Sequence, residues 1–359
     1  MLGEAMHGKM KAQMFYAPGD VRFEETDIPQ IGDDEILVKV RAALTCGTDL
    51  KTYRRGHPTI IQYVPSTFGH EFASDVVEVG RNVTKFKVGD RVVGANTAPC
   101  FQCDNCKSQR YSLCTNLQYL NGAFSEYVAV PEHILKYNYY MIPDGLRYEY
   151  AALLEPLACA VHGFDTLPPR VGDYAVVIGA GPIGLMFMDL LHLAGCRVIS
   201  ADLSDHRLEL SKSFGVEATV NAGDENYIDQ VRKLTDSKGP QIVVEATGFP
   251  SAWEAAFEMA RPGATVLCFG GTKAGSKVTF DCRKFHYDEI TLKGVYHHTP
   301  YHVKWALDLL ASGQIDGSKY ISGYYPLEKA IDALESIGRQ EGIKYVILPS
   351  GTKEDLGLR

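Results

Sequence analysis

The chain of 359 residues has no long run of basic residues and no long uninterrupted apolar run. Lysine and arginine never fill more than two consecutive positions, and the formal net charge is −8. Because phosphate binding needs a cationic face, this composition argues against a nucleic-acid or anionic-membrane partner. The longest apolar run, Tyr174 to Met188, contains three glycines and a proline and is shorter than a bilayer requires. We therefore expect a globular protein with no membrane span.

The cysteines do not form the pattern of a secreted protein. There are nine, an odd number, and four of them lie between residues 100 and 114. Secreted disulfide frameworks are shorter and more evenly cross-linked, so the cluster favours a metal in a reducing compartment. The stretch Met1 to Lys11 has no apolar core of the kind found in signal peptides. We therefore expect a cytoplasmic protein.

Two patterns divide the chain. The first 160 residues are rich in short alternating runs, which predict strands over 36–41, 71–79, 90–94 and 123–130 and a β-rich, barrel-like domain. After Pro168-Pro169, apolar strands alternate with helical patterns, which predicts a doubly wound parallel sheet. The predicted strands there are 174–178, 197–201, 241–245, 264–269 and 291–295. A helix over 301–312 and a strand over 344–348 follow. The fold class is therefore α/β.

The segment 179–184 fits the dinucleotide motif G-x-G-x-x-G. It follows an apolar strand and opens an apolar helix, which is the context that the motif requires. In that context the glycines allow a tight turn, close approach of a pyrophosphate and close helix packing. The alternative is a glycine turn with no ligand. The candidate cofactor-binding residues of this turn are Gly179, Gly181, Pro182, Ile183 and Gly184.

Asp202 ends the next strand, 18 residues beyond the last glycine. Its carboxylate can accept hydrogen bonds from both hydroxyls of the adenosine ribose, and it would repel a 2′-phosphate. The sequence therefore predicts NAD over NADP. Arg207 is the nearest arginine, and it is either a surface or packing residue or a group that tolerates some NADP.

Four cysteines are spaced C-x2-C-x2-C-x7-C. Four thiolates this close can form a closed tetrahedral shell, so we interpret them as a structural zinc site. An iron–sulfur cluster or two disulfides are the alternatives. The residues are Cys100, Cys103, Cys106 and Cys114.

Cys46, His70, Glu71 and Glu155 form a second candidate metal site. Each residue alone is weak evidence for a metal site, because a single histidine is often a packed or exposed residue and a single cysteine is usually a small buried group. Their contexts strengthen the hypothesis. Cys46 ends an apolar strand, His70 lies between a glycine and an acid, and Glu155 lies in an apolar stretch where a carboxylate needs a partner.

Taken together, these motifs resemble the zinc-containing medium-chain alcohol and polyol dehydrogenase family, and the sorbitol, threonine and butanediol dehydrogenase branch in particular. The resemblance covers essentially the whole chain. It rests on Cys46-Gly-Thr-Asp49, Gly69-His-Glu71, the four-cysteine lobe, Glu155 to His162 and the glycine turn. It implies a GroES-like catalytic domain over 1–160, with the lobe at about 97–117, a Rossmann NAD-binding domain over 161–300, and a segment over 301–359 that returns to the catalytic domain.

The resemblance also implies roles. Cys46 and His70 would be zinc ligands, and Glu71 or Glu155 would complete the shell, where alcohol dehydrogenases carry a second cysteine. Asp49 would hold the His70 ring. The implied cofactors are NAD and two zinc ions per chain, one catalytic and one structural.

The implied reaction moves a hydride between NAD and a secondary alcohol, which zinc activates as a Lewis acid. Thr48 would take the alcohol proton, or it caps the local turn. Lys51 stands where many relatives have a relay histidine, and it either relays protons or faces solvent, which we favour. His297 and His298 would lie near the substrate, which favours a polyol or sugar derivative.

Three alternatives remain open at this stage. The enzyme could act on threonine as an amino alcohol, or on butanediol or another secondary alcohol. It could also be a non-catalytic protein that binds zinc and NAD as a redox sensor, although the complete ligand set argues against this. By analogy with relatives we expect a homotetramer or homodimer.

Overall fold

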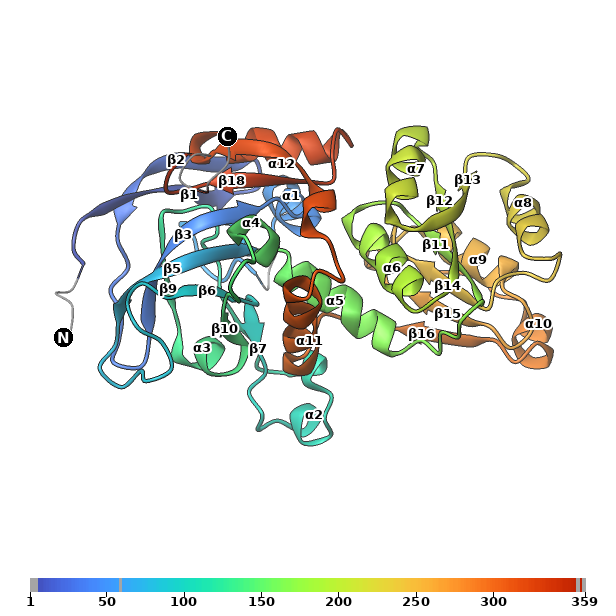
Figure 1. Cartoon of the computed structure of the whole chain (residues 1–359), viewed down its shortest axis with the longest axis horizontal. Coiled ribbons are helices and arrows are strands. Elements are labelled where there is room, and N and C mark those ends of the chain that lie inside the picture. The colour runs from blue at the N-terminus through green and yellow to red at the C-terminus, as the bar shows by residue number, and fades with distance from the viewer. Residues whose placement is uncertain (1–5, 58–59, 353–355, 357–359) are drawn as a thin grey trace. The chain divides into compact units, whose positions relative to one another are not determined.

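The computed structural model describes residues 6–57, 60–352 and 356. The first five residues, which belong to the stretch expected to carry no targeting signal, lie outside the described residues. The chain forms two compact units: one contains the residues up to Ala158 and those from Thr299 onward, and the other is Cys159–His298. Both ends of the sequence therefore contribute to the first unit, as the blue and red ribbons show (Figure 1).

The first unit is built mainly of strands. Its largest sheet has the order β10-β6-β5-β3-β18-β17, with β9 also paired to β3, and a smaller sheet has the order β2-β1-β4. The strands are β1 (Lys9–Ala17), β2 (Asp20–Asp27), β3 (Ile36–Leu44), β4 (Ser66–Thr67), β5 (Phe72–Val79), β6 (Arg91–Gly94), β7 (Thr97–Ala98), β8 (Gln118–Tyr119), β9 (Tyr127–Val130), β10 (Tyr139–Met141), β17 (Ile321–Pro326) and β18 (Lys344–Leu348).

Helices connect and cover these strands. They are α1 (Gly47–Arg55), α2 (Asp104–Lys107), α3 (Glu132–Asn138), α4 (Tyr148–Ala151), α11 (Pro300–Ala311) and α12 (Ala330–Gly338), with α5 (Leu154–Asp165) leading out of the unit. Short 3₁₀ turns occupy Tyr111–Leu113, Gly317–Tyr320 and Leu327–Lys329. No helix among the described residues is long and apolar enough to cross a membrane.

Most of the predicted strands are confirmed, but the one over 123–130 is only half right. The strand begins at Tyr127. The preceding residues turn a corner instead: Gln13 N–H donates to the Phe124 carbonyl, and Phe124 N–H donates to the Phe68 carbonyl. Phe124 is fully buried there and packs edge-on against Phe68, which lies at a ring distance of 5.6 Å. Apolar character in this stretch therefore reflects core packing rather than continuous strand pairing.

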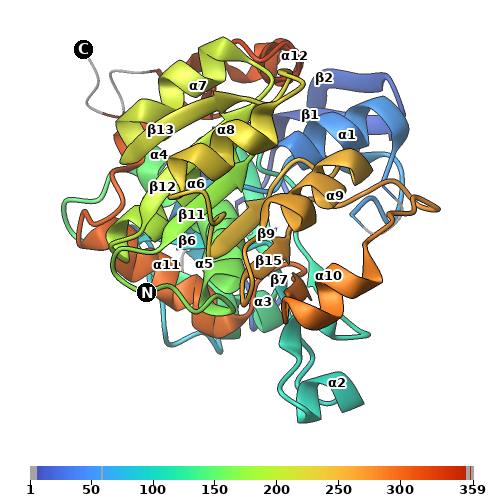
Figure 2. The same cartoon turned by 90° about the vertical axis from the view of Figure 1, so that its right-hand side faces the viewer.

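The second unit is a six-stranded parallel sheet of order β13-β12-β11-β14-β15-β16, of which Figure 2 labels β13, β12, β11 and β15. Its strands are β11 (Tyr174–Ile178), β12 (Arg197–Asp202), β13 (Val216–Asn221), β14 (Ile242–Glu245), β15 (Thr265–Cys268) and β16 (Thr291–Gly294). The chain moves outward from β11 to β13 and then returns to the other side of β11, so the order reverses between β11 and β14. This is the doubly wound arrangement that the alternating pattern predicts.

Helices of this unit are α6 (Pro182–Leu193), α7 (Asp205–Ser211), α8 (Tyr227–Leu234), α9 (Pro250–Met259) and α10 (Cys282–Tyr287). The predicted N-cap of α7 is confirmed, because the Ser204 side chain accepts from Arg207 N–H. The chain then tightens into a 3₁₀ turn (Lys212–Phe214) that ends at Gly215, whose φ of +72° is the left-handed conformation that glycine favours. The fold class expected from the sequence is confirmed.

Candidate metal and cofactor sites

Cys46 lies between β3 and α1. It is the N-cap of α1, and its sulfur accepts from Thr48 N–H at 3.4 Å. Asp49 follows in the first helical turn and is only 1% exposed. The helix start therefore places a thiol and a buried carboxylate side by side. Burial and the nearby Glu71 carboxylate raise the pKa of the Cys46 thiol.

His70 and Glu71 come from the turn before β5. Gly69 precedes them with a φ of +85°, and a Cβ atom there would come within 2.9 Å of the Phe124 ring, so only glycine fits. The His70 Nδ1 atom lies 2.8 Å from Asp49 Oδ1, as expected for a carboxylate that orients a ligating imidazole. In the neutral ring with Nδ1–H donating to Asp49, Nε2 keeps the lone pair that a metal ligand needs. Burial acts to lower the pKa of His70, but the Asp49 carboxylate and the Cys46 sulfur together outweigh it and raise this pKa well above its ordinary value.

Cys46, His70 and Glu71 each offer a ligand atom within 4.8 Å of the other two. A thiolate, an imidazole and a carboxylate are the donor types that zinc takes in proteins. The buried Oε1 of Glu71 makes no hydrogen bond in the described structure, although such an atom is costly to leave unpaired. These residues therefore fit a zinc ion, with Glu71 Oε1 as the oxygen donor.

The other carboxylate oxygen of Glu71 pairs with the ammonium group of Lys344, a residue that the sequence patterns did not indicate. Lys344 Nζ lies 2.5 Å from Glu71 Oε2 and 3.0 Å from the Thr45 carbonyl oxygen. Both side chains are buried, at 2% and 0% exposure. Burial acts to lower the pKa of Lys344, but the Glu71 carboxylate, helped by Cys46 and Glu155, outweighs it and raises this pKa. A lysine that opens an apolar strand was a signal that could have revealed this pair, because a buried charge needs a partner.

Other candidates of the first unit lie around this set. Glu155, on the first turn of α5, is 7% exposed, and its carboxylate does not join the group of atoms within 4.8 Å. Its charge nevertheless helps to raise the pKa of Lys344. Thr48 is half-buried on α1, while Lys51 on the same helix is exposed.

The four lobe cysteines also form one group, with sulfur atoms within 4.8 Å of one another. Backbone N–H groups point at these sulfurs: Cys100 N donates to Cys114 Sγ at 3.2 Å, and Cys103 N donates to Cys100 Sγ at 3.4 Å. Backbone N–H groups favour thiolates: they lower the pKa of Cys103 to about 6 and lower that of Cys100, whereas burial raises the pKa of Cys106 and that of Cys114. None of the nine cysteines forms a disulfide in the structure, and the four lobe sulfurs converge as one group, which favours a shared metal over two disulfides. Four converging thiols with N–H support fit a closed structural zinc site.

The glycine turn of the second unit is packed tightly, as the dinucleotide motif requires. A Cβ atom on Gly184 would lie 1.7 Å from the Gly179 carbonyl oxygen, so no side chain fits. Pro182 begins α6 and Gly181 caps it. Asp202 supports the turn from β12: its Oδ2 accepts from Ala180 N–H at 2.7 Å and its Oδ1 accepts from Ser204 N–H at 2.9 Å.

Arg207 lies against the same turn. Its Nη1 donates to the Ala180 carbonyl oxygen at 3.1 Å. Burial lowers the pKa of Arg207, and the Asp202 carboxylate opposes that shift. Arg207 is therefore a partly buried cation beside the turn rather than a surface residue. His297 and His298 also belong to this unit, beyond β16, with ring centroids 3.9 Å apart.

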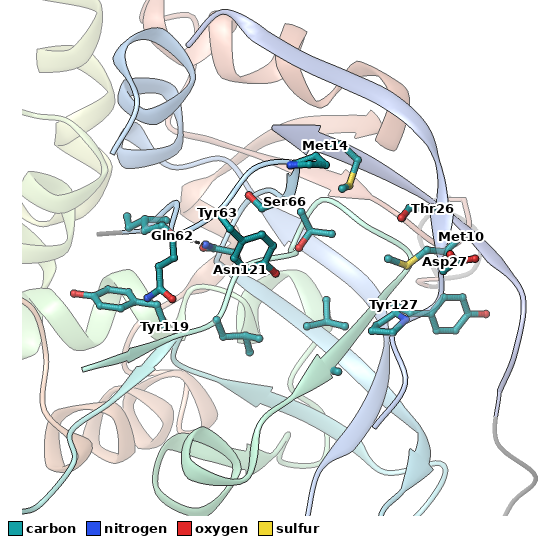
Figure 3. Close-up of a pocket in the computed structure, with 17 residues that line it drawn as sticks. Met10, Met14, Thr26, Asp27, Gln62, Tyr63, Ser66, Tyr119, Asn121 and Tyr127 are labelled. Atoms are coloured by element: carbon teal, nitrogen blue, oxygen red, sulfur yellow. Dashed lines mark hydrogen bonds between the residues drawn. The ribbon is translucent and has the colours of Figure 1, made fainter. Parts of the chain in front are cut away.

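A separate cavity of about 330 Å³ lies in the first unit (Figure 3). Met10 and Met14 of β1, Ser66 of β4, Tyr119 of β8 and Tyr127 of β9 line it. None of the candidate zinc ligands is among its lining residues, so this cavity is not the metal site.

Comparison with known proteins shows the family. Residues 32–139 match the family model described as alcohol dehydrogenase GroES-like domain, and residues 182–312 match zinc-binding dehydrogenase. Sorbitol dehydrogenase from Bacillus subtilis (strain 168) is 31% identical over 95% of this chain and 98% of its own. L-threonine 3-dehydrogenase from Chelativorans sp. (strain BNC1) is 34% identical over 88% of this chain and 92% of its own.

A comparison with solved structures finds the same family. A chain from Sinorhizobium meliloti 1021, solved bound to NADP, superposes with a TM-score of 0.88 at 30% identity and covers 95% of this chain and 100% of that one. The chain thus belongs to the zinc-dependent alcohol dehydrogenase family, in its sorbitol and threonine dehydrogenase-like branch. It is an oxidoreductase, as the motifs implied.

Proposed function

We propose that this dehydrogenase moves a hydride between NAD and a secondary alcohol, most suitably a polyol or sugar derivative, with catalysis at the Cys46, His70 and Glu71 site. The observation that carries the proposal is the unpaired, buried Glu71 Oε1 beside a thiol and an oriented imidazole. When bound, zinc supplies Lewis acidity toward the alcohol oxygen, and the dinucleotide accepts or returns the hydride.

The chain's own residues have separable tasks. Asp49 holds the His70 ring so that Nε2 faces the metal position, and Lys344 holds one oxygen of Glu71 so that only Oε1 is free to bind. Glu71 is therefore our proposed carboxylate ligand, and Glu155 is a nearby negative charge. Thr48, half-buried and two residues beyond Cys46, takes the proton of the alcohol. Lys51 faces solvent and is not part of this path.

NAD is the proposed cofactor because of Asp202. Its carboxylate lies at the end of β12 beside the glycine turn, where an adenosine 2′-phosphate would be repelled. The S. meliloti relative was solved with NADP, and Arg207 is the group here that would favour it. Comparing kcat/KM for NAD and NADP decides between them, and a preference for NADP would refute the role given to Asp202.

The names of the relatives indicate the class of substrate. We propose a polyol or sugar derivative first, with threonine as the alternative because a threonine dehydrogenase is 34% identical. The experiment is NADH formation across polyols, sugars, inositols, secondary alcohols and threonine, with wild type and Cys46→Ser in parallel. We expect turnover of one class by wild type and none by Cys46→Ser.

Metal analysis tests the two zinc sites. We expect about two zincs per wild-type chain and about one in Cys46→Ser, with the remaining zinc in the four-cysteine lobe. A Cys46→Ser protein that kept full activity would contradict the catalytic site. The free cysteines are consistent with the cytoplasmic location that we propose, and we propose a homotetramer or homodimer by analogy with the branch.

A further inference from the structure

Glu245 is a buried acid that the proposed reaction does not use. It ends β14 and is 0% exposed. Its Oε1 accepts from Thr247 N–H at 2.7 Å, from Gly248 N–H at 2.9 Å and from the Thr247 hydroxyl. Burial raises the pKa of Glu245, and the groups that oppose this rise are neighbouring hydrogen-bond donors rather than basic side chains. Burying a carboxylate without a basic partner costs free energy, so its presence at this position calls for an explanation.

The loop that Glu245 holds lies against two others. Ala246 N–H donates to the Ile178 carbonyl at 2.9 Å, and a Cβ atom on Gly179 would lie 2.7 Å from Thr247 Cγ2. The segment 246–249 therefore touches the glycine turn directly. The Glu245 carboxylate accepts charge-assisted hydrogen bonds from Thr247 N–H and Gly248 N–H, and these bonds fix the start of this segment.

The loop after β15 approaches from the other side. A Cβ atom on Gly270 would lie 2.1 Å from Gly248 N and 2.7 Å from Glu245 Oε2. Gly248 itself has a φ of +80°, and a Cβ atom there would lie 2.5 Å from the Gly271 carbonyl oxygen. The loops that follow β11, β14 and β15 thus pack against one another beside the Glu245 carboxylate, so closely that side chains at their glycines would clash.

This meeting point is the place where the strand order of the sheet reverses. Ligands of doubly wound sheets bind outside the carboxyl ends of the strands at such a switch point, with one mononucleotide on each half. Asp202, at the end of β12, marks the adenosine half. The loops after β14 and β15 therefore belong to the half that receives the nicotinamide nucleotide.

We propose that Glu245 is a positioning residue, which fixes the segment 246–249 and the neighbouring Gly270 loop as a preformed floor for the nicotinamide half of the dinucleotide. The proposal rests on the proposed function, because it assumes that the second unit binds a dinucleotide. Glu245 acts through Thr247 and Gly248, and it need not touch the ligand itself.

The test compares two ligands. AMP occupies only the adenosine half, whereas NADH occupies both. In the intact enzyme, Glu245→Gln replaces charge-assisted hydrogen bonds by neutral ones and is expected to raise the Kd for NADH by about tenfold. The Kd for AMP should stay within about twofold of wild type, because the Asp202 half is unchanged. A general loss of structure would weaken both ligands.

Glu254→Gln is the matched control. Glu254 lies in the same unit and also holds a loop, since its Oε1 accepts from Thr279 N–H at 2.8 Å, but it is away from the switch point. We expect its NADH and AMP affinities to equal those of wild type. Binding is followed by NADH fluorescence and calorimetry, and thermal melting confirms that each variant is folded.

Thr247→Val provides a second route if Glu245→Gln fails to fold. It keeps the methyl group that packs near Gly179 and removes only the hydroxyl that donates to Glu245. We expect a rise of about threefold in the NADH Kd, with AMP unchanged. Folded variants whose NADH affinity equals wild type would overturn the proposal. A wild-type protein that binds neither ligand would instead overturn the proposed function.

Discussion

Replacing Lys344 by methionine tests how the metal site is supported. The ammonium group is 2% exposed and lies 2.5 Å from Glu71 Oε2, which is fully buried. Lys344→Met keeps an unbranched apolar side chain and removes the ammonium group, so the Glu71 carboxylate loses its only ion-pair partner in the described structure and the Thr45 carbonyl loses a hydrogen bond. Breaking a buried pair from one side costs about 3–5 kcal/mol, because the remaining charge stays desolvated.

Thermal melting measures this cost. For a domain of 150–250 residues, each kcal/mol shifts the Tm by about 2–4 °C, so we expect a fall of about 10 °C. Zinc concentration must be equal in all samples, because bound metal adds its own stabilisation. Adding Glu71→Gln to Lys344→Met should recover part of the loss, since position 71 then no longer holds a buried charge without its lysine partner.

Lys304→Met is the matched control. Lys304 also pairs with a carboxylate at 2.5 Å, that of Asp308, but the side chains are 54% and 59% exposed. Exposed helical pairs contribute about 0.3–0.5 kcal/mol, so its Tm should change by no more than about 2 °C. If Lys344→Met melted within about 1 °C of wild type, the reasoning that Lys344 stabilises a buried Glu71 charge would be wrong.

Two further substitutions test the sites separately. Gly184→Ala would place a methyl group 1.7 Å from the Gly179 carbonyl, so we expect loss of NADH binding in fluorescence titration, whereas Gly294→Ala, with open space around its Cβ position, should bind as wild type. Asp49→Asn keeps the shape but removes the negative charge beside the His70 ring, and we expect zinc affinity to fall by about 10–100-fold in competition with a chelator. Unchanged zinc affinity would contradict the orienting role of Asp49.

Local patterns predicted most of the second unit. Tyr174–Ile178 is an uninterrupted apolar strand, and it leads directly into the glycine turn. Both features are complete within a few residues of sequence, so the strand and its turn could be recognised without knowledge of tertiary contacts. The N-cap at Ser204 is also local, because its side chain bonds to an N–H three residues away.

Contacts between distant parts of the chain were harder to predict. Lys344 and Glu71 are 273 residues apart, and no spacing rule connects them. The sequence placed two glutamates near the metal but could not decide between them, because that choice depends on which carboxylate Lys344 reaches. Glu245 was not predicted for a related reason. In the sequence it is only the last residue of an apolar strand, and the role that we propose for it depends on the packing of three loops that are distant in sequence.

The order in which the chain is made has a consequence for the first unit. β18 pairs with β3 through Val346 and Leu44, yet all of Cys159–His298 is translated between them. At about 5–20 residues per second, synthesis of the roughly 300 residues between these two strands lasts on the order of tens of seconds. During it, β3 waits with a pairing partner missing, and Glu71 waits without the lysine that neutralises it. The second unit is contiguous, so all its residues are available for folding before the last strand of the first unit is made. Strand edges left open this long are prone to pair with other chains, which makes the nascent first unit the part that most needs chaperone protection.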